Sequence, residues 1–470
     1  MLFNSLEFAG FATITLILYW MLRLRGQNVL LLIASYLFYS AWDWRFLSLL
    51  IFQSLVDYVA GLGIGRSEDE QVRKRYLIGA ITINLLVLAT FKYFGFFVDS
   101  AIGLLRWIGL EPNPPLLEII LPIGISFYTF QSITYSFDVY RRRLPPTRSF
   151  LNYAVFVAYF PHMIAGPIQR ANHLLPQIER PRTRPDGRQV RSGLFLIVMG
   201  LFKKVAIADA VAGVANEVFQ RGSDAGSATL LIGVVAFSLQ IYGDFAGYSD
   251  CARGVSRLFG IELTRNFEQP YLSRNITEFW RTWHISLSSW LHDYLYIPLG
   301  GNQGGKLITY RNLMLTMLLG GLWHGASWTF VIWGGLHGLW LAVHRALGGY
   351  AQRGLPATPR WRDVPSILAT FGGVSLLWVF FRSGTLTQAM DYLGGLFSFA
   401  PGSVDPDHLI LVAFSALMVL VLDLGQRITG DHSVVLRWSP PVRGAAIGVL
   451  LLSVLMWSGG DAQPFIYFQF

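Results

Sequence analysis

The stretch GGLWHGASWTFVIWGGLHG, residues 320–338, contains no lysine, arginine, aspartate or glutamate. A run this long and apolar suits a lipid bilayer, which a helix crosses in about 20 residues. Nevertheless, His324 lies in it, between Trp323 and Gly325. Ionisable groups within membrane spans are costly and usually face a bundle interior, where they serve a pathway or a reaction. The stretch therefore predicts a membrane fold and a histidine with a function.

The composition of the whole chain is typical of a membrane protein. Of its 470 residues, 53% are hydrophobic and 14% are charged, whereas soluble proteins carry about 25% charged residues. We predict an all-α polytopic protein with a single membrane-embedded domain over residues 1–470. The net charge of +9 comes from basic residues that cluster in short loops. Positive-inside topology explains this clustering, so no nucleic-acid partner is expected.

Apolar segments recur from end to end, and they predict about 11 transmembrane helices together with re-entrant and amphipathic helices. The first of them lacks a basic n-region and a cleavage site, so we interpret it as a retained span. We divide the chain into N-terminal spans (1–148), a catalytic core (149–346) and C-terminal spans (347–470). The candidate spans are residues 6–22, 28–44, 46–65, 76–98, 116–138, 193–213, 228–248, 309–322, 327–346, 364–381, 407–425 and 443–458.

Three basic clusters, at residues 23–26, 73–75 and 141–143, set the expected orientation. Alternating spans place all three clusters in the cytoplasm only if the N-terminus faces outside.

The segment 150–169 would break this alternation, because crossing would export the arginines that follow it up to residue 191. Pro161, Gly166 and Pro167 also interrupt its helix, since proline lacks an N–H donor and clashes with the preceding turn. We therefore predict a re-entrant segment, with residues 170–191 in the cytoplasm. Non-helical backbone at membrane depth requires surrounding protein or a water-filled cavity, and such a cavity suits a site.

Residues 275–297 have the pattern of an amphipathic helix. Asn275 followed by Glu278 resembles a capping box, and Pro298 with two glycines ends the run. One face is rich in tryptophan, and a polar stripe runs beside it. The members of that stripe are Arg281, His284, Ser288 and His292. We expect this helix to lie along the interface or to line a cavity.

His284 and His324 are the candidate catalytic residues. The alternative for each is a packing histidine bonded to a backbone carbonyl. For His324, the neighbouring glycines favour close approach of a substrate or of another backbone. Burial disfavours imidazolium, so a histidine there stays neutral and is able to accept a proton, as a general base for a hydroxyl nucleophile must.

Other polar residues carry weaker signals. We interpret His337 as packing or interfacial, His162 as a faint signal in the re-entrant segment, and His292–Asp293 as an interfacial pair. Asp244 and Asp250 are expected at a span end, paired with an arginine such as Arg253. The single cysteine, Cys251, rules out an intrachain disulfide and disfavours a thiol nucleophile. No metal-binding, nucleotide-binding or nucleophile-elbow motif occurs, so no metal and no permanently bound cofactor is expected.

Long motifs in order along the chain resemble the membrane-bound O-acyltransferase (MBOAT) family. More narrowly, the chain is similar to the bacterial alginate O-acetyltransferase branch. The motifs are LLIASYLFYSAWDWRFLSLL, FKYFGFF, LPIGISFYTFQSITYSFDVYR, FPHMIAGPIQR, GYSDCARG, NFEQPYLSRNITEFW, FWRTWHISLSSWLHDYLYIPLGGN, LLGGLWHGASWTFVIWGGLHG and PFIYFQF. The resemblance implies a helical bundle around a central tunnel. It also makes His324 of LWHG the catalytic histidine and His284 of RTWHIS a second active-site residue.

The resemblance further implies transfer of an acyl group, with acetyl favoured, from acetyl-CoA or another cytoplasmic thioester toward an exported glycan. Arginines of 170–191, together with Lys203 and Lys204, are expected to attract a phosphate-bearing donor. The acceptor is either the sugar itself or a serine of an extracytoplasmic SGNH-type acetyltransferase, in a polysaccharide biosynthesis complex of the bacterial inner membrane. The second route is favoured by family analogy.

Other functions remain open at this point. A proton-coupled transporter uses intramembrane histidines, but it predicts charges spread over several spans and inverted repeats. A membrane glycosyltransferase needs acidic residues at a loop, and no convincing acidic pair is present. Within the family, D-alanyl transfer to teichoic acid and acylation of cellulose or peptidoglycan are further alternatives.

Overall fold

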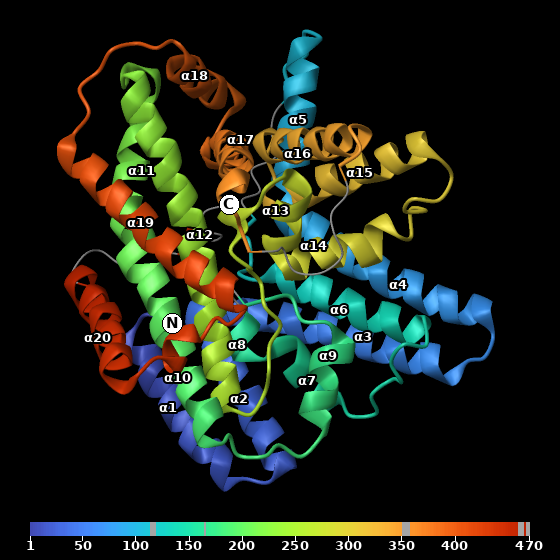
Figure 1. Ribbon diagram of the computed structural model, residues 1–470. Coiled ribbons are helices and arrows are strands. Elements are labelled where there is room, and N and C mark those ends of the chain that lie inside the picture. Colours follow the sequence, from blue (N-terminus) through green and yellow to red (C-terminus); the bar gives the residue numbers. More distant parts are fainter. Residues whose placement is uncertain (113–118, 164–165, 350–357, 459–464, 467–470) are drawn as a thin grey trace. The chain divides into compact units, whose positions relative to one another are not determined.

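All the regular structure in the described part of the chain is helical (Figure 1). The computed structural model describes residues 1–112, 119–163, 166–349, 358–458 and 465–466. Six helical stretches in these residues are long and apolar enough to cross a membrane. They are Leu24–Arg66, Glu70–Trp107, Ser227–Leu258, Trp361–Arg382, Pro406–Thr429 and Pro440–Trp457. The predicted all-α, multi-pass membrane fold is therefore confirmed.

The chain forms two compact units, and each is described by itself. The first comprises Met1–Gly193 and Ala252–Thr264, and the second comprises Leu194–Cys251 and Arg265–Phe470. The helices α10 (Gly187–Leu201) and α12 (Ser227–Leu258) each continue from one unit into the other. The single domain and its three regions stay a prediction.

The first unit contains a long hairpin of antiparallel helices. Arg73, from the basic cluster 73–75, is buried and donates to the carbonyls of Ile64 at 2.8 Å and Tyr140 at 2.7 Å. A guanidinium at these positions satisfies carbonyls near the C-terminal ends of two helices. The cluster therefore lies in a helix and not in a loop. The helices of this unit are α1 (Leu6–Met21), α2 (Leu24–Asp43), α3 (Leu47–Arg66), α4 (Glu70–Leu88), α5 (Phe94–Trp107) and α6 (Ile125–Tyr140).

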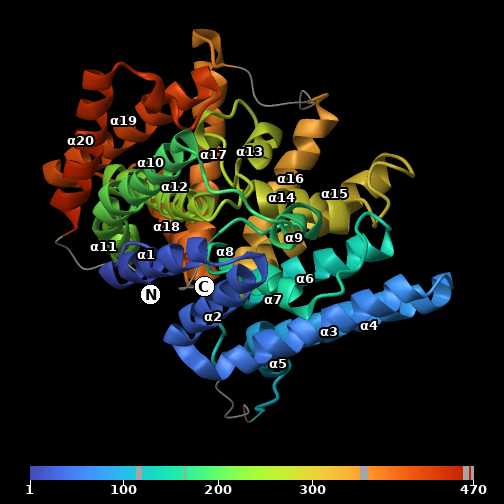
Figure 2. The same ribbon diagram turned by 90° about the horizontal axis from the view of Figure 1, so that it is seen from below.

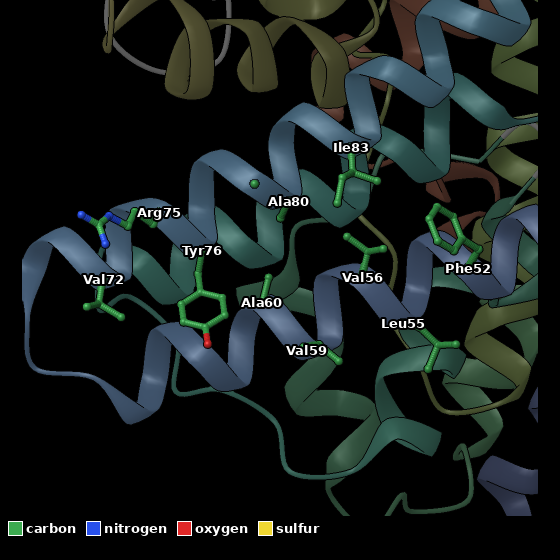
Figure 3. A pocket seen from close by; sticks show the side chains of 11 residues that line it. Phe52, Leu55, Val56, Val59, Ala60, Val72, Arg75, Tyr76, Ala80 and Ile83 are labelled. Carbon is green, nitrogen blue, oxygen red and sulfur yellow. The ribbon is translucent and has the colours of Figure 1, made fainter.

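An apolar groove of about 750 Å³ runs along α3 and α4, which lie side by side (Figures 2 and 3). Its polar side chains are Arg75 and Tyr76, and no histidine, cysteine or carboxylate lines it. The groove therefore has no group suited to general base catalysis at neutral pH. Its lining residues are Phe52, Leu55, Val56, Val59, Ala60, Val72, Arg75, Tyr76, Gly79, Ala80 and Ile83.

The expected span 116–138 is wrong in its extent. Residues 116–118 lie outside the described part, and residues 119–124 are not helical. The helix α6 begins only at Ile125, after Gly124 with a φ of 75°. Such a left-handed residue, close behind Pro122, prevents an earlier start.

The segment 150–169 contains short helices, as its prolines predict. α7 (Phe150–Ala158) and α8 (Phe160–Met163) are separated at Tyr159, and α9 (Ala171–Glu179) follows. The amide of Phe160 donates to Ser35 Oγ at 3.0 Å instead of continuing the helix. The 9 residues of α7 span about 14 Å, less than half of the hydrocarbon core. Residues 164–165 lie outside the described part, and the re-entrant course stays a prediction.

The second unit holds the remaining long helices. A π-helix, Phe202–Asp209, joins α10 to α11 (Ala210–Arg221), so the expected span 193–213 lies within a longer helical stretch. The expected spans 309–322 and 327–346 correspond to α15 (Lys306–His324) and α16 (Trp328–Ala346). The C-terminal helices are α17 (Val364–Arg382), α18 (Leu386–Phe397), α19 (Pro406–Thr429) and α20 (Pro440–Trp457). Of these, α18 was not predicted.

Candidate active site

His324 is the last residue of α15, at the turn of a tightly packed helical hairpin (Figure 1). A Cβ at Gly321 would lie 2.2 Å from the carbonyl oxygen of Phe330, and one at Gly334 would lie 2.2 Å from that of Met317. A Cβ at Gly325 would meet the Phe330 ring at 2.1 Å. Glycine is therefore needed for the two backbones to approach. The sequence predicted that the glycines near His324 allow close approach of a substrate or of another backbone. The approach of another backbone is confirmed at Gly321.

The imidazole of His324 is enclosed by aromatic rings. Its centroid lies 5.0 Å from that of Trp323, 5.1 Å from that of Trp333 and 5.3 Å from that of Phe381. The side chains pack edge to face, and His324 is 4% exposed. Charges in such an apolar shell interact more strongly than in water.

His284 lies at a break in the chain, and the single helix expected over residues 275–297 is wrong. The helix α13 (Ile276–Thr282) ends before it, and α14 (Ile285–Leu291) begins after it, followed by a π-helical turn over His292–Tyr296. His284 itself adopts a left-handed conformation with a φ of 43°. The break therefore interrupts the predicted polar stripe.

The local reason for the break is a competing partner for the backbone. The amide of Ile285 donates to the carbonyl of Asn266 at 2.9 Å, and the amide of Glu268 donates to the carbonyl of Thr282 at 3.0 Å. The loop thus replaces the intrahelical bonds that a continuous helix would make. The predicted start of the segment is confirmed, since Asn275 Oδ1 accepts from the amide of Glu278 at 2.9 Å.

The two candidate histidines meet in the second unit. Their ring centroids are 6.3 Å apart, with the planes inclined by 64°. His284 also packs against Phe245 at 4.6 Å and Trp323 at 5.8 Å. The turn that carries His284 lies outside the six membrane-crossing stretches, and burial lowers the pKa of His284 to about 3. An imidazole in this state is neutral at physiological pH and suited to accept a proton or a hydrogen bond.

Three other histidines, which the sequence analysis had interpreted, have contacts of their own. His337 is buried, and its Nδ1 accepts from the indole Nε1 of Trp280 at 3.3 Å, which confirms packing. His162 lies in the first unit, where its Nε2 is 2.8 Å from Gln131 Oε1. His292 is exposed and pairs with Asp293 at 2.7 Å, and its place at a membrane interface stays a prediction.

The expected roles of Lys203 and Lys204 in attracting a donor are wrong. Both side chains are buried, at 6% and 3% exposed. Lys203 pairs with Asp250 at 2.8 Å, and Lys204 pairs with Asp244 at 2.8 Å and Asp209 at 2.7 Å. A cation that is buried against carboxylates has little field left for a ligand outside the protein.

The same pairs correct the interpretation of the two aspartates. Asp244 and Asp250 lie within α12 (Ser227–Leu258) and not at a span end. Both pair with lysines of the π-helix.

Part of the arginine-rich loop is fixed to α1. Arg182 donates to Tyr19 Oη at 2.8 Å, and Arg184 donates to the carbonyl of Trp20 at 2.8 Å. Arg180, Arg188 and Arg191 are exposed. Arg184 is exposed as well but is held by its bond to Trp20, so Arg180 of the loop and Arg188 and Arg191 of the first turns of α10 are the arginines left open to a charged ligand.

The structure adds three residues that lie in the quoted motifs but had been given no role. Asn266 Oδ1 lies 3.1 Å from His284 Nδ1 and accepts from Ser286 Oγ at 2.9 Å, while the other end of the Asn266 amide donates to Ser249 Oγ at 3.3 Å. Ser286 follows His284 by two residues, but Asn266 lies 18 positions earlier, so local spacing carried no signal for its contact with His284. Within the described residues, no group of three or more histidine, cysteine, aspartate or glutamate side chains could hold a metal ion.

Comparison with known proteins gives the family. The model of the MBOAT, membrane-bound O-acyltransferase family, matches residues 36–371. A probable alginate O-acetylase of Pseudomonas putida is 40% identical over the whole of both chains. That of Pseudomonas syringae pv. tomato is 46% identical over 85% of this chain and 76% of its own. A peptidoglycan O-acetyltransferase of Helicobacter pylori is 38% identical over 84% of this chain and 80% of its own. The chain therefore belongs to the membrane-bound O-acyltransferase family and is a multi-pass membrane O-acyltransferase.

Proposed function

We propose that this O-acyltransferase moves an acetyl group from a cytoplasmic thioester, such as acetyl-CoA, toward an exported polysaccharide of the alginate type. The names of its alginate O-acetylase relatives support the acetyl group and the polysaccharide. The observation that carries the proposal is the pair of buried imidazoles, 6.3 Å apart, brought together from two separate segments.

In the proposed reaction, His324 is the general base. It takes the proton from the accepting hydroxyl while that oxygen attacks the thioester carbonyl. The C–O bond forms, the C–S bond breaks, and the leaving thiolate receives the proton from the His324 imidazolium. The positive charge on the protonated His324 lies inside the aromatic shell, where the absence of water strengthens its electrostatic interaction with the reacting groups.

His284 has the second role, which is to orient the hydroxyl. Asn266 Oδ1 accepts from the amide of Ser286 at 3.3 Å, so the nearby His284 Nδ1 is the donor of their 3.1 Å contact. The basic nitrogen of the neutral ring is then Nε2. A ring in this tautomer does not donate a hydrogen bond to a carbonyl oxygen. Because the single proton of the attacking hydroxyl goes to His324, Nε2 of His284 orients that hydroxyl indirectly, by accepting a hydrogen bond from another donor group of the acceptor. This geometry favours orientation over polarisation of the carbonyl.

The proposed setting is the bacterial inner membrane, with the N-terminus outside and residues 66–75, 141–148 and 170–191 in the cytoplasm. The exposed Arg180, Arg188 and Arg191 are the groups that would attract a phosphate-bearing donor there. The acceptor that we favour is a serine of an SGNH-type extracytoplasmic acetyltransferase, which passes the group on to the polymer.

The test uses a deletion strain complemented with single variants. We expect His324→Ala to abolish acetylation of the exported polymer and His284→Ala to impair it severely, with His284→Asn milder because asparagine retains a hydrogen-bonding oxygen. His292→Ala is the control, since this histidine is exposed and pairs only at the surface. Equal amounts of protein in the membrane must be verified.

Polymer acetyl content is measured together with the mass of the transferred group. Wild-type acetylation in His324→Ala would refute the assignment of the base. A transferred mass of D-alanine would replace the proposed acetyl donor by another acyl donor.

A further inference from the structure

We propose that Asn266 is a positioning residue that fixes the tautomer and the orientation of His284. This inference rests on the proposed role of His284 in acyl transfer. It goes beyond that role because it assigns a function to a residue of a different segment, the loop after α12.

The backbone of Asn266 holds the turn that carries His284. Its carbonyl accepts from the amide of Ile285 at 2.9 Å, immediately after the histidine. Two residues further along the loop, the amide of Glu268 donates to the carbonyl of Thr282 at 3.0 Å, on the other side of the break. The loop therefore clamps both ends of the turn. A left-handed non-glycine residue such as His284 persists only where surrounding contacts determine it.

The side chain of Asn266 has one possible orientation. Its Oδ1 accepts from the amide of Ser286 at 3.3 Å and from Ser286 Oγ at 2.9 Å. A backbone N–H is only a donor, so the atom that faces it must be the amide oxygen. On its other side, Nδ2 donates to Ser249 Oγ at 3.3 Å. Asn266 is 1% exposed, so water does not compete for these bonds.

The consequence for His284 follows from hydrogen-bond chemistry. An oxygen acceptor 3.1 Å from Nδ1 requires that this nitrogen carries the proton. The lone pair then resides on Nε2, and the ring cannot flip without losing the bond. Partners that orient a functional histidine in this way typically change activity by about 10- to 100-fold when they are removed.

The experiment measures turnover of radiolabelled acetyl-CoA in membrane vesicles that contain the full chain and its native partners. Asn266→Ala is expected to lower kcat by about 10- to 100-fold with little change in the KM for acetyl-CoA. Ser249→Ala removes only the distant anchor of the amide, so its loss is expected to be smaller. The double variant Asn266→Ala/His284→Ala should be no slower than His284→Ala alone, because Asn266 acts through the histidine.

Asn266→Asp separates positioning from simple packing. The carboxylate retains the acceptor oxygen and has nearly the same size, so activity at neutral pH should be largely kept. A carboxylate beside an imidazole favours imidazolium, so protonation should inactivate this variant at a pH about 1 to 3 units higher than in the wild type.

The outcomes distinguish this inference from the proposed function. If wild-type vesicles do not turn over acetyl-CoA, or His284→Ala is fully active, the proposed function fails. If His284→Ala is inactive and Asn266→Ala has wild-type kinetics, only the inference fails. It also fails if Asn266→Asp keeps the pH profile of the wild type, or if the double variant is slower than His284→Ala. Should Asn266→Ala not fold, the pH profile of Asn266→Asp still decides.

Discussion

Substitution of Gly334 by alanine should push α16 away from α15, the helix that ends in the proposed base His324. A Cβ at this position would lie 2.2 Å from the carbonyl oxygen of Met317, whereas real Cβ contacts are essentially never under 3.0 Å. The obstacle is backbone and cannot rotate away, so α16 must move from α15 by about 1 Å to restore an ordinary contact. His324 ends α15, and it would move with this shift.

Gly335→Ala is a matched control on the same helix. Its Cβ would meet only Leu318 Cδ2 at 3.2 Å, the flexible end of a side chain. Both substitutions gain the same helix propensity, about 1 kcal/mol, so that gain cancels when they are compared. Overpacking in a dense interior costs about 1–3 kcal/mol. Gly334→Ala should therefore be less stable than Gly335→Ala by about that amount.

The activity should fall further than the stability. A misplacement of about 1 Å in a catalytic arrangement lowers the rate by about 100-fold. The assay is acetyl-CoA turnover in membrane vesicles, together with the apparent midpoint of thermal unfolding in detergent, both compared between the two variants. Equal midpoints and equal rates in Gly334→Ala and Gly335→Ala would refute the account of the hairpin.

Three further predictions follow from other parts of the chain. Lys203→Met leaves Asp250 buried without its 2.8 Å partner, so the free energy of unfolding should fall by about 3–5 kcal/mol. Thermal unfolding in detergent measures this loss, and the double variant Lys203→Met/Asp250→Leu should recover part of it. A single variant as stable as the wild type would contradict the prediction. The pKa of His284 is lowered by burial from its ordinary 6.5 to about 3, so the ring should become protonated only when the pH falls to that range. The ¹⁵N NMR signal of His284 can be assigned by its loss in His284→Gln. Titration of that signal near pH 6.5 would contradict the lowered pKa. Reporter fusions after residue 70 should report a cytoplasmic location. A single cysteine at residue 186, in a Cys251→Ala background, should not react with an impermeant reagent added outside intact cells. Labelling at residue 186 would show that the arginine-rich loop is exported.

The helices that could be predicted from the sequence are those whose ends are marked by local chemistry. The hairpin of α15 and α16 is an example, because glycine and serine punctuate two apolar runs, and its helices lie close to the predicted ranges. The family motifs also predicted His284 and His324 as active-site residues, although the sequence did not show that their rings lie 6.3 Å apart.

The features that could not be predicted depend on contacts between distant residues. The pattern of residues 275–297 is continuous, and the helix breaks at His284 only because a loop 18 positions earlier supplies Asn266 as a partner. Likewise, two adjacent lysines in the sequence are typical of a surface, but Lys203 and Lys204 are buried because α12 supplies Asp250 and Asp244 as their partners. Local sequence does not contain these partners, so the lysines were wrongly assigned to donor attraction.

The most direct test of the central claim is the rate of acetyl-CoA turnover by His324→Gln in vesicles that contain wild-type amounts of the folded protein. Glutamine retains polar atoms in the aromatic shell but is not able to act as a base at neutral pH. Because general base catalysis contributes about 100- to 10,000-fold to a rate, the account predicts a loss of that size with little change in the KM for acetyl-CoA. Turnover at the wild-type rate would contradict it.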